Sequence, residues 1–213
     1  MHLRYLSLPV SDGRHNLSLL PQIRTFEWIV QFLTRLNTSR KWYTKFNPVD
    51  YEDEDKDAMK DELFAIRGKL RDELNIDVGI SNGELEQSTG GAFKTLSSDA
   101  GRRVLKEMVD IRDGDDASLP DTFDWIFLRL SAIVIVMNSS KKKIDLQKYN
   151  KLCKDVSVKI VDEFPWVRMS ESIHRVLCHS GEFIERNQGK GLGGHSEEVR
   201  IQLVPVVLMH QAL

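Results

Sequence analysis

The sequence predicts a mainly α-helical protein, and two observations support this prediction. Apolar residues recur at helical spacing in five long stretches. The segments between them contain glycine, asparagine and proline, which interrupt helices, and serine or aspartate, which cap them.

The composition is that of an ordinary soluble globular protein. The chain has 213 residues, of which 41% are hydrophobic and 29% charged, enough for one or two domains with a real core. A net charge of −2 gives no overall basic field, so any contact with nucleic acid would have to be local. Two cysteines are too few for a disulfide framework and favour a reduced, intracellular setting. The longest apolar run, 132–137, is too short to cross a membrane.

The first predicted helix covers 19–36, with Pro21 in its first turn. Its apolar stripe includes Ile23, Phe26, Val30 and Leu33, and its polar residues are placed mostly on the opposite face: Arg24, Glu27, Gln31 and Arg35. A second helix is predicted over 55–74, after an acidic run that suits a helix N-terminus. Residues 75–91 contain several helix breakers.

Three more long helices and a short one are predicted in the second half. The first covers 99–111 and is capped by Ser97 or Ser98, and the second covers 120–137, with β-branched residues in its last turn. The third covers 145–164 and is ended by Pro165. It is expected to bury Cys153 as a small hydrophobic residue. A short helix begins at Ser170 or Glu171 and carries two histidines, with Gly181 expected to help end it.

The segment 38–48 interleaves basic and aromatic residues, and two interpretations are open. Such interleaving can grip a nucleic-acid strand. The favoured alternative is a loop that places Trp42 and Phe46 in the core.

His174 and His179 form an H-x4-H pair, a spacing typical of half a zinc site. Positions five apart on a regular helix point about 140° away from each other. Both histidines can therefore face one metal only if the helix ends between them, as Gly181 makes plausible. Cys178 is a further candidate ligand. The alternative is a packed or surface histidine pair without metal.

Three segments, taken in order, carry a resemblance to known proteins. The first is LPVSDGRHNLSLLPQIRTFEWIVQFLTRL, the second is STGGAFKTL, and the third runs from Met169-Ser170 through Ile173-His174-Arg175-Val176-Leu177-Cys178-His179 to Gly193 and Ser196-Glu197-Glu198. Together they resemble the Transib transposases and the catalytic subunit of the RAG (V(D)J) recombinase. The histidine segment is the most specific of the three.

The resemblance implies a particular place in a larger fold. Family members have an RNase H-like (DDE) catalytic core interrupted by a mostly helical insertion. Residues 1–198 would be that insertion and its zinc-binding region, without the core sheet, and 199–213 would be a divergent apolar tail. The family's structural zinc implies that His174 and His179 are half of a site, whose two cysteines would lie before Met1.

The resemblance also implies a chemistry. Family catalysis uses two aspartates and one glutamate that hold two divalent ions, usually magnesium. The glutamate is expected at the position of Ile201, so Glu197 and Glu198 are the only nearby candidates for a catalytic carboxylate. The chain is accordingly expected to be inactive alone.

The implied partner is DNA at transposon ends, contacted through Lys94 and Thr89. Intact members would be homodimers in the nucleus, with no membrane association. One alternative is a domesticated, non-enzymatic module that binds DNA or protein. Another is an unrelated helical domain without zinc.

Overall fold

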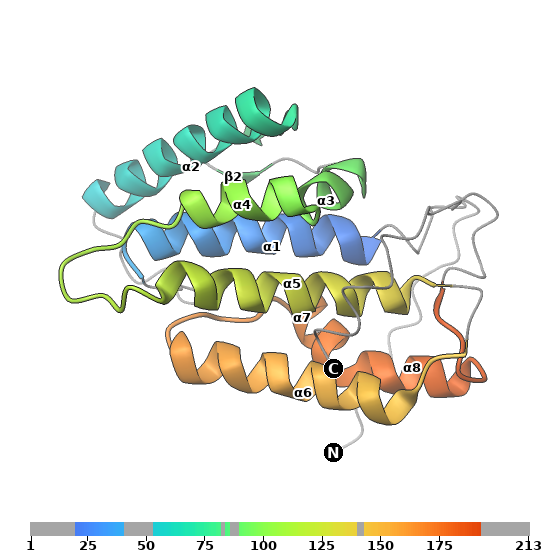
Figure 1. Cartoon of the computed structure of the whole chain (residues 1–213). Coiled ribbons are helices and arrows are strands. Elements are labelled where there is room, and N and C mark those ends of the chain that lie inside the picture. Colours follow the sequence, from blue (N-terminus) through green and yellow to red (C-terminus); the bar gives the residue numbers. More distant parts are fainter. Residues whose placement is uncertain (1–19, 41–52, 82–83, 86–89, 140–142, 193–213) are drawn as a thin grey trace, which may run out of the picture.

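The computed structural model describes residues 20–40, 53–81, 84–85, 90–139 and 143–192 (Figure 1). The protein is mainly helical, as the sequence predicts. The elements are α1 (Leu20–Asn37), α2 (Asp53–Leu74), β1 (Ile80–Ser81), β2 (Glu84–Leu85), α3 (Gly90–Leu96), α4 (Asp99–Glu107), α5 (Leu119–Met137), α6 (Leu146–Glu163), α7 (Glu171–His174), the π-helical turn η1 (Arg175–His179) and α8 (Ser180–Arg186). The two short strands pair antiparallel, with Ile80 opposite Leu85.

Helix α1 lies at the centre of the bundle (Figure 1). It contacts α2, α3, α5 and α7. Most of its surface is therefore covered, and this includes part of the face predicted to be polar. Glu27, placed on the face opposite the apolar stripe, is only 8% exposed. Its carboxylate accepts a hydrogen bond of 2.7 Å from the Arg24 guanidinium, which partly offsets the cost of burying a charge.

An aromatic cluster around Phe32 fixes α1 to the segment that precedes the histidine helix. Phe32 is fully buried, and its ring centre lies 4.9–5.9 Å from four other rings: Trp28, Phe123, Phe164 and Trp166. The Trp28 indole also donates a hydrogen bond of 3.3 Å to the Arg168 carbonyl. These contacts hold the chain in position just before Ser170, where α7 begins.

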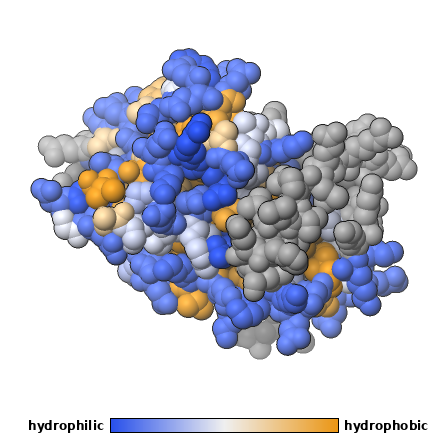
Figure 2. Space-filling model, viewed as in Figure 1, coloured by the Kyte–Doolittle hydropathy of each residue, from blue (hydrophilic) through white to orange (hydrophobic). Residues whose placement is uncertain are grey.

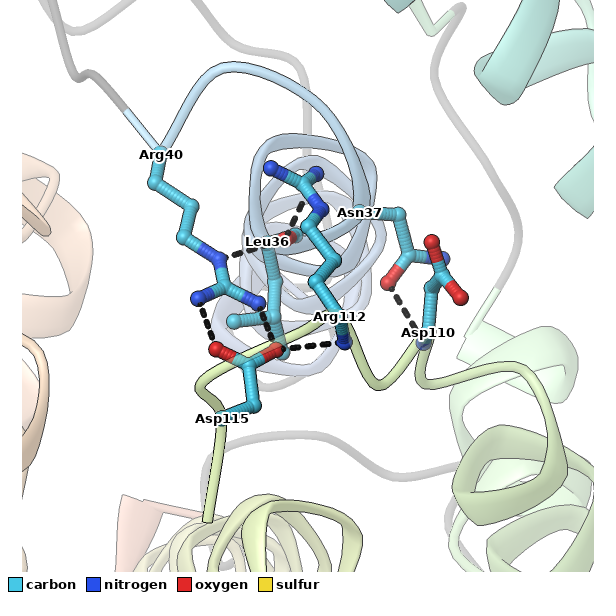
Figure 3. A network of polar contacts seen from close by, with 6 residues as sticks. All are labelled: Leu36, Asn37, Arg40, Asp110, Arg112 and Asp115. Carbon is cyan, nitrogen blue, oxygen red and sulfur yellow. Dashed lines mark hydrogen bonds and ion pairs between the residues drawn. The ribbon is translucent and has the colours of Figure 1, made fainter. Parts of the chain in front are cut away.

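The C-terminus of α1 is tied to the loop between α4 and α5 (Figure 3). Arg40 forms two hydrogen bonds of 2.5 Å with the Asp115 carboxylate, which also accepts one of 2.8 Å from the Arg112 amide. Both guanidinium groups donate to the Leu36 carbonyl, at 3.1 Å and 3.3 Å. Positive groups at this end complement the helix dipole and bond carbonyls that the helix leaves free.

Helix α4 begins where the sequence predicts but ends earlier. Ser98 caps it by accepting a hydrogen bond of 3.2 Å from the Gly101 amide. The helix was expected to reach Ile111 and instead ends at Glu107. Asn37 supplies the reason, because its side chain donates to the Met108 carbonyl at 2.7 Å. It also accepts a hydrogen bond of 3.0 Å from the Asp110 amide (Figure 3). A residue from α1 thus takes over backbone groups that a longer helix would use.

Helix α3 was not predicted, and it begins at a pair of glycines. Helices α5 and α6 match their predicted ranges closely, and the β-branched end of α5 remains helical to Met137.

Hydrophilic residues cover most of the described surface in Figure 2, with hydrophobic residues in separate small groups. No helix in the described ranges combines the length and apolar character needed to cross a bilayer.

Candidate metal half-site on a π-helical turn

The histidine helix starts as predicted and continues further than predicted. The Ser170 hydroxyl caps α7 by accepting a hydrogen bond of 3.3 Å from the Ile173 amide. The chain then passes through η1 and α8 without a break, to Arg186. The prediction that Gly181 helps end this helix is wrong.

Gly181 has a packing role instead. A Cβ atom built on it would lie 2.0 Å from Oδ1 of Asn150 on α6. Glycine at this position therefore leaves room for the Asn150 side chain between the two helices.

The π-helical turn changes how the two histidines face. In a π-helix the backbone bonds run from residue i to i+5, so positions five apart lie nearly above one another. His174 immediately precedes η1 and His179 is its last residue. Their ring centres are 5.2 Å apart, with an angle of 70° between the ring planes. The prediction that the helix must end between them is therefore wrong, because a wider turn brings the rings together within a continuous helix.

The spacing of the rings fits a shared zinc ion. Two imidazoles that bind one tetrahedral zinc at about 2.0–2.1 Å have ring centres roughly 5 Å apart. Both histidines are exposed to solvent, so a metal could reach them. The same separation is ordinary for an edge-to-face ring pair, and so it permits a shared metal without requiring one.

The described residues bring two candidate ligands together at this place, whereas a structural zinc site needs four. No group of three or more His, Cys, Asp or Glu side chains within the described ranges could hold a metal ion. Cys178 is exposed but does not complete a site with its neighbour His179. The nearest carboxylate to His179 that forms an ion pair is Glu182, 3.8 Å from Nδ1. Two imidazoles are therefore the candidate ligands that the described residues bring together here.

Buried polar groups on α6 and α8 support the π-helical turn. Ser180 is 1% exposed, and its hydroxyl donates to the Val176 carbonyl, inside the turn. The Tyr149 hydroxyl on α6 lies 2.8 Å from the same Ser180 oxygen. Burial raises the pKa of Tyr149 far above its usual range, so the phenol is neutral and available for this hydrogen bond.

These supporting residues were not identified from the sequence as part of the site. A serine directly after His179 carries no distinctive pattern, and Tyr149 is 31 residues away from Ser180 in the chain. The sequence feature that pointed to this site was the H-x4-H spacing of His174 and His179.

The other predicted site residues are only partly described. Lys94 lies exposed on α3, in its last turn. Thr89, Glu197, Glu198 and Ile201 lie outside the described residues, as do Trp42 and Phe46.

Comparison with known proteins leaves the family unassigned. No protein-family model matches the chain, and no curated protein matches it. The resemblance to transposases therefore depends on the sequence motifs alone.

Proposed function

We propose that this chain is the helical insertion region of a Transib- or RAG-like transposase and that His174 and His179 are half of its structural zinc site. The observation that carries the proposal is the π-helical turn, which places the two imidazoles 5.2 Å apart in a continuous helix. The order of the three sequence motifs supports the same family.

A zinc ion with four ligands supplies folding free energy and would join the histidine turn to the segment that carries the two cysteines. This chain's own residues prepare the turn for that contact. Ser180 and Tyr149 hold the π-helical backbone, and the Trp28 indole holds the segment before α7. The histidines thus face solvent on a supported element.

The chain alone is proposed to lack endonuclease activity. Family chemistry requires three carboxylates and magnesium. Glu197 or Glu198 would have to act as the third carboxylate, because Ile201 stands at the expected position. Magnesium, transposon-end DNA, a homodimer and a nuclear location belong to the intact protein in this proposal.

Metal titration of the full chain tests the half-site. Cobalt(II), added as a spectroscopic substitute for zinc, should bind the wild type and lose more than about tenfold in affinity when His174 and His179 are both replaced by Ala, since even indirect partners of a metal ligand are worth about that much. Replacing His2 and His15 by Ala removes the same number of imidazoles and should leave the affinity unchanged. Equal losses in both double variants would refute the half-site.

A non-enzymatic DNA-binding module is the second candidate. It is favoured by the absence of a glutamate at position 201, where Ile201 stands. A mobility-shift titration without magnesium tests it. Lys94→Ala should reduce the slope of log affinity against log salt by about one if Lys94 contacts a phosphate. Lys60→Ala, which removes another exposed lysine from α2, is the matched control. Absence of any salt-sensitive shift would exclude DNA binding by the chain alone.

A further inference from the structure

The two cysteines lie on opposite sides of the contact between α6 and the histidine turn. The two segments run antiparallel (Figure 1). Tyr149 contacts Ser180, and Asn150 lies against Gly181. One helical turn further along α6, and one turn back along the other segment, this register places Cys153 opposite Cys178. Both cysteines line the same open groove, together with Leu177 and Ser157.

Helix α6 packs against both η1 and α8 around this point. Gly181 leaves room for the Asn150 side chain, which reaches across from α6. A disulfide requires Cα atoms about 4.4–6.8 Å apart, a separation that only closely packed helices provide. The contact at Gly181 lies one turn from the cysteine pair, on the same interface.

The two thiols differ in exposure. Cys178 is exposed to solvent and Cys153 is 3% exposed. Burial is the main cause that raises the pKa of Cys153 to about 11, and the neighbouring Cys178 adds to the shift. Cys153 is therefore a protonated thiol beneath the groove, and an oxidant from solvent meets Cys178 first.

We propose that Cys178 and Cys153 form a redox modification site that reacts with hydroperoxides and closes to an intramolecular disulfide. The Cys178 sulfur attacks the peroxide oxygen, the O–O bond breaks, and a sulfenic acid and one water (or alcohol) form. The Cys153 sulfur then displaces hydroxide from the sulfenic acid, the S–S bond forms, and a second water leaves with the thiol proton. The two thiols are oxidised and the peroxide is reduced.

The disulfide would join α6 to the π-helical turn beside His179. Closing should be slower than the first oxidation, because the buried Cys153 is rarely a thiolate. The inference does not depend on the proposed transposase origin, because it uses only the packing of α6 against η1 and α8.

Oxidation of the purified full chain tests the proposal. The chain is treated with a small excess of hydrogen peroxide, free thiols are alkylated, and peptides are mapped by mass spectrometry without reduction. The expected result is a peptide pair linked through Cys153 and Cys178, preceded by a sulfenic acid at Cys178 that dimedone traps. The link should be absent in Cys178→Ser, an exposed position whose change leaves the core intact.

Two controls test whether the fold, and not random encounter of the thiols, brings Cys153 and Cys178 together. In denaturant, the yield of the Cys153–Cys178 link should fall several-fold. In Cys153→Ala, dimedone labelling of Cys178 should persist because no second thiol can close the bond. The proposal is overturned if the folded wild type gives only overoxidised Cys178 or intermolecular dimers, or if folded and denatured chains give the link equally.

Discussion

The aromatic cluster around Phe32 makes the sharpest prediction about stability. Phe32 is fully buried and its ring contacts four others, from α1, α5 and the segment after α6. Phe32→Ala removes the ring that all four share. The remaining side chains come from three elements, so they cannot collapse into the space without moving a helix.

The magnitude follows from burial and ring contacts. Phe→Ala substitutions in cores cost about 3–5 kcal/mol. Edge-to-face pairs contribute about 0.5–1.5 kcal/mol each beyond their buried area, which places this site in the upper part of that range. A loss of about 4–5 kcal/mol is a large share of the roughly 5–15 kcal/mol that stabilises a typical protein. The melting temperature should fall by about 8–20 °C.

Urea unfolding followed by circular dichroism measures the loss. The matched control is Phe64→Ala on α2, because Phe64 is 45% exposed and should cost less than about 1 kcal/mol. A Phe32→Ala variant as stable as the Phe64→Ala variant, with an unchanged denaturant slope, would refute the packing described here.

Three further predictions concern an ion pair, a glycine and a hydrogen bond. The Arg40 guanidinium holds the pKa of the Asp115 carboxyl well below its usual range, so the stabilisation from this ion pair is present above about pH 4 and is lost as pH falls. Asp115→Asn should therefore lower the urea midpoint at pH 7, and the difference between the variant and the wild type should shrink toward pH 2. Gly101→Ala should destabilise the protein by about 1–3 kcal/mol in thermal melts, because the new Cβ would meet backbone carbonyl oxygens at 2.4 Å. Gly68→Ala has open space around the new Cβ and should stabilise the protein by about 0.5–1 kcal/mol. A change of the same sign in both variants would contradict the close approach of α4 to the end of α3. Tyr149→Phe should cost about 1 kcal/mol in urea unfolding and increase hydrogen exchange in the histidine turn, because Ser180 loses one of its two hydrogen-bond partners. Unchanged exchange would show that α6 does not support the turn.

Much of the fold could be predicted from local pattern. Apolar spacing located α1, α2, α5 and α6, and the short polar residues Ser98 and Ser170 marked two helix starts, because a cap needs only a side-chain oxygen next to free backbone amides. These features depend on residues a few positions apart. The sequence alone therefore determined the helical class, most helix limits and the H-x4-H pair as the candidate site.

The features that the sequence did not indicate all depend on contacts between distant residues. Helix α4 stops at Glu107 because Asn37 bonds the backbone beyond it, and Glu27 is buried because helices cover α1 on several sides. Periodicity describes one helix at a time and cannot register such neighbours.

The geometry of the candidate site was likewise a tertiary outcome. On a regular helix, the H-x4-H spacing points the two rings about 140° away from each other. Nothing in the sequence indicated that the helix departs from regular geometry here. In the fold, one turn is instead widened into a π-helix. Ser180 bonds the Val176 carbonyl inside this turn, and Tyr149 on α6 bonds Ser180. Gly181 leaves room for the Asn150 side chain of α6. The sequence by itself determined which two histidines to consider. Only the packing of α6 against this turn decided that they face each other, because the backbone register there is set by side chains about 30 residues away.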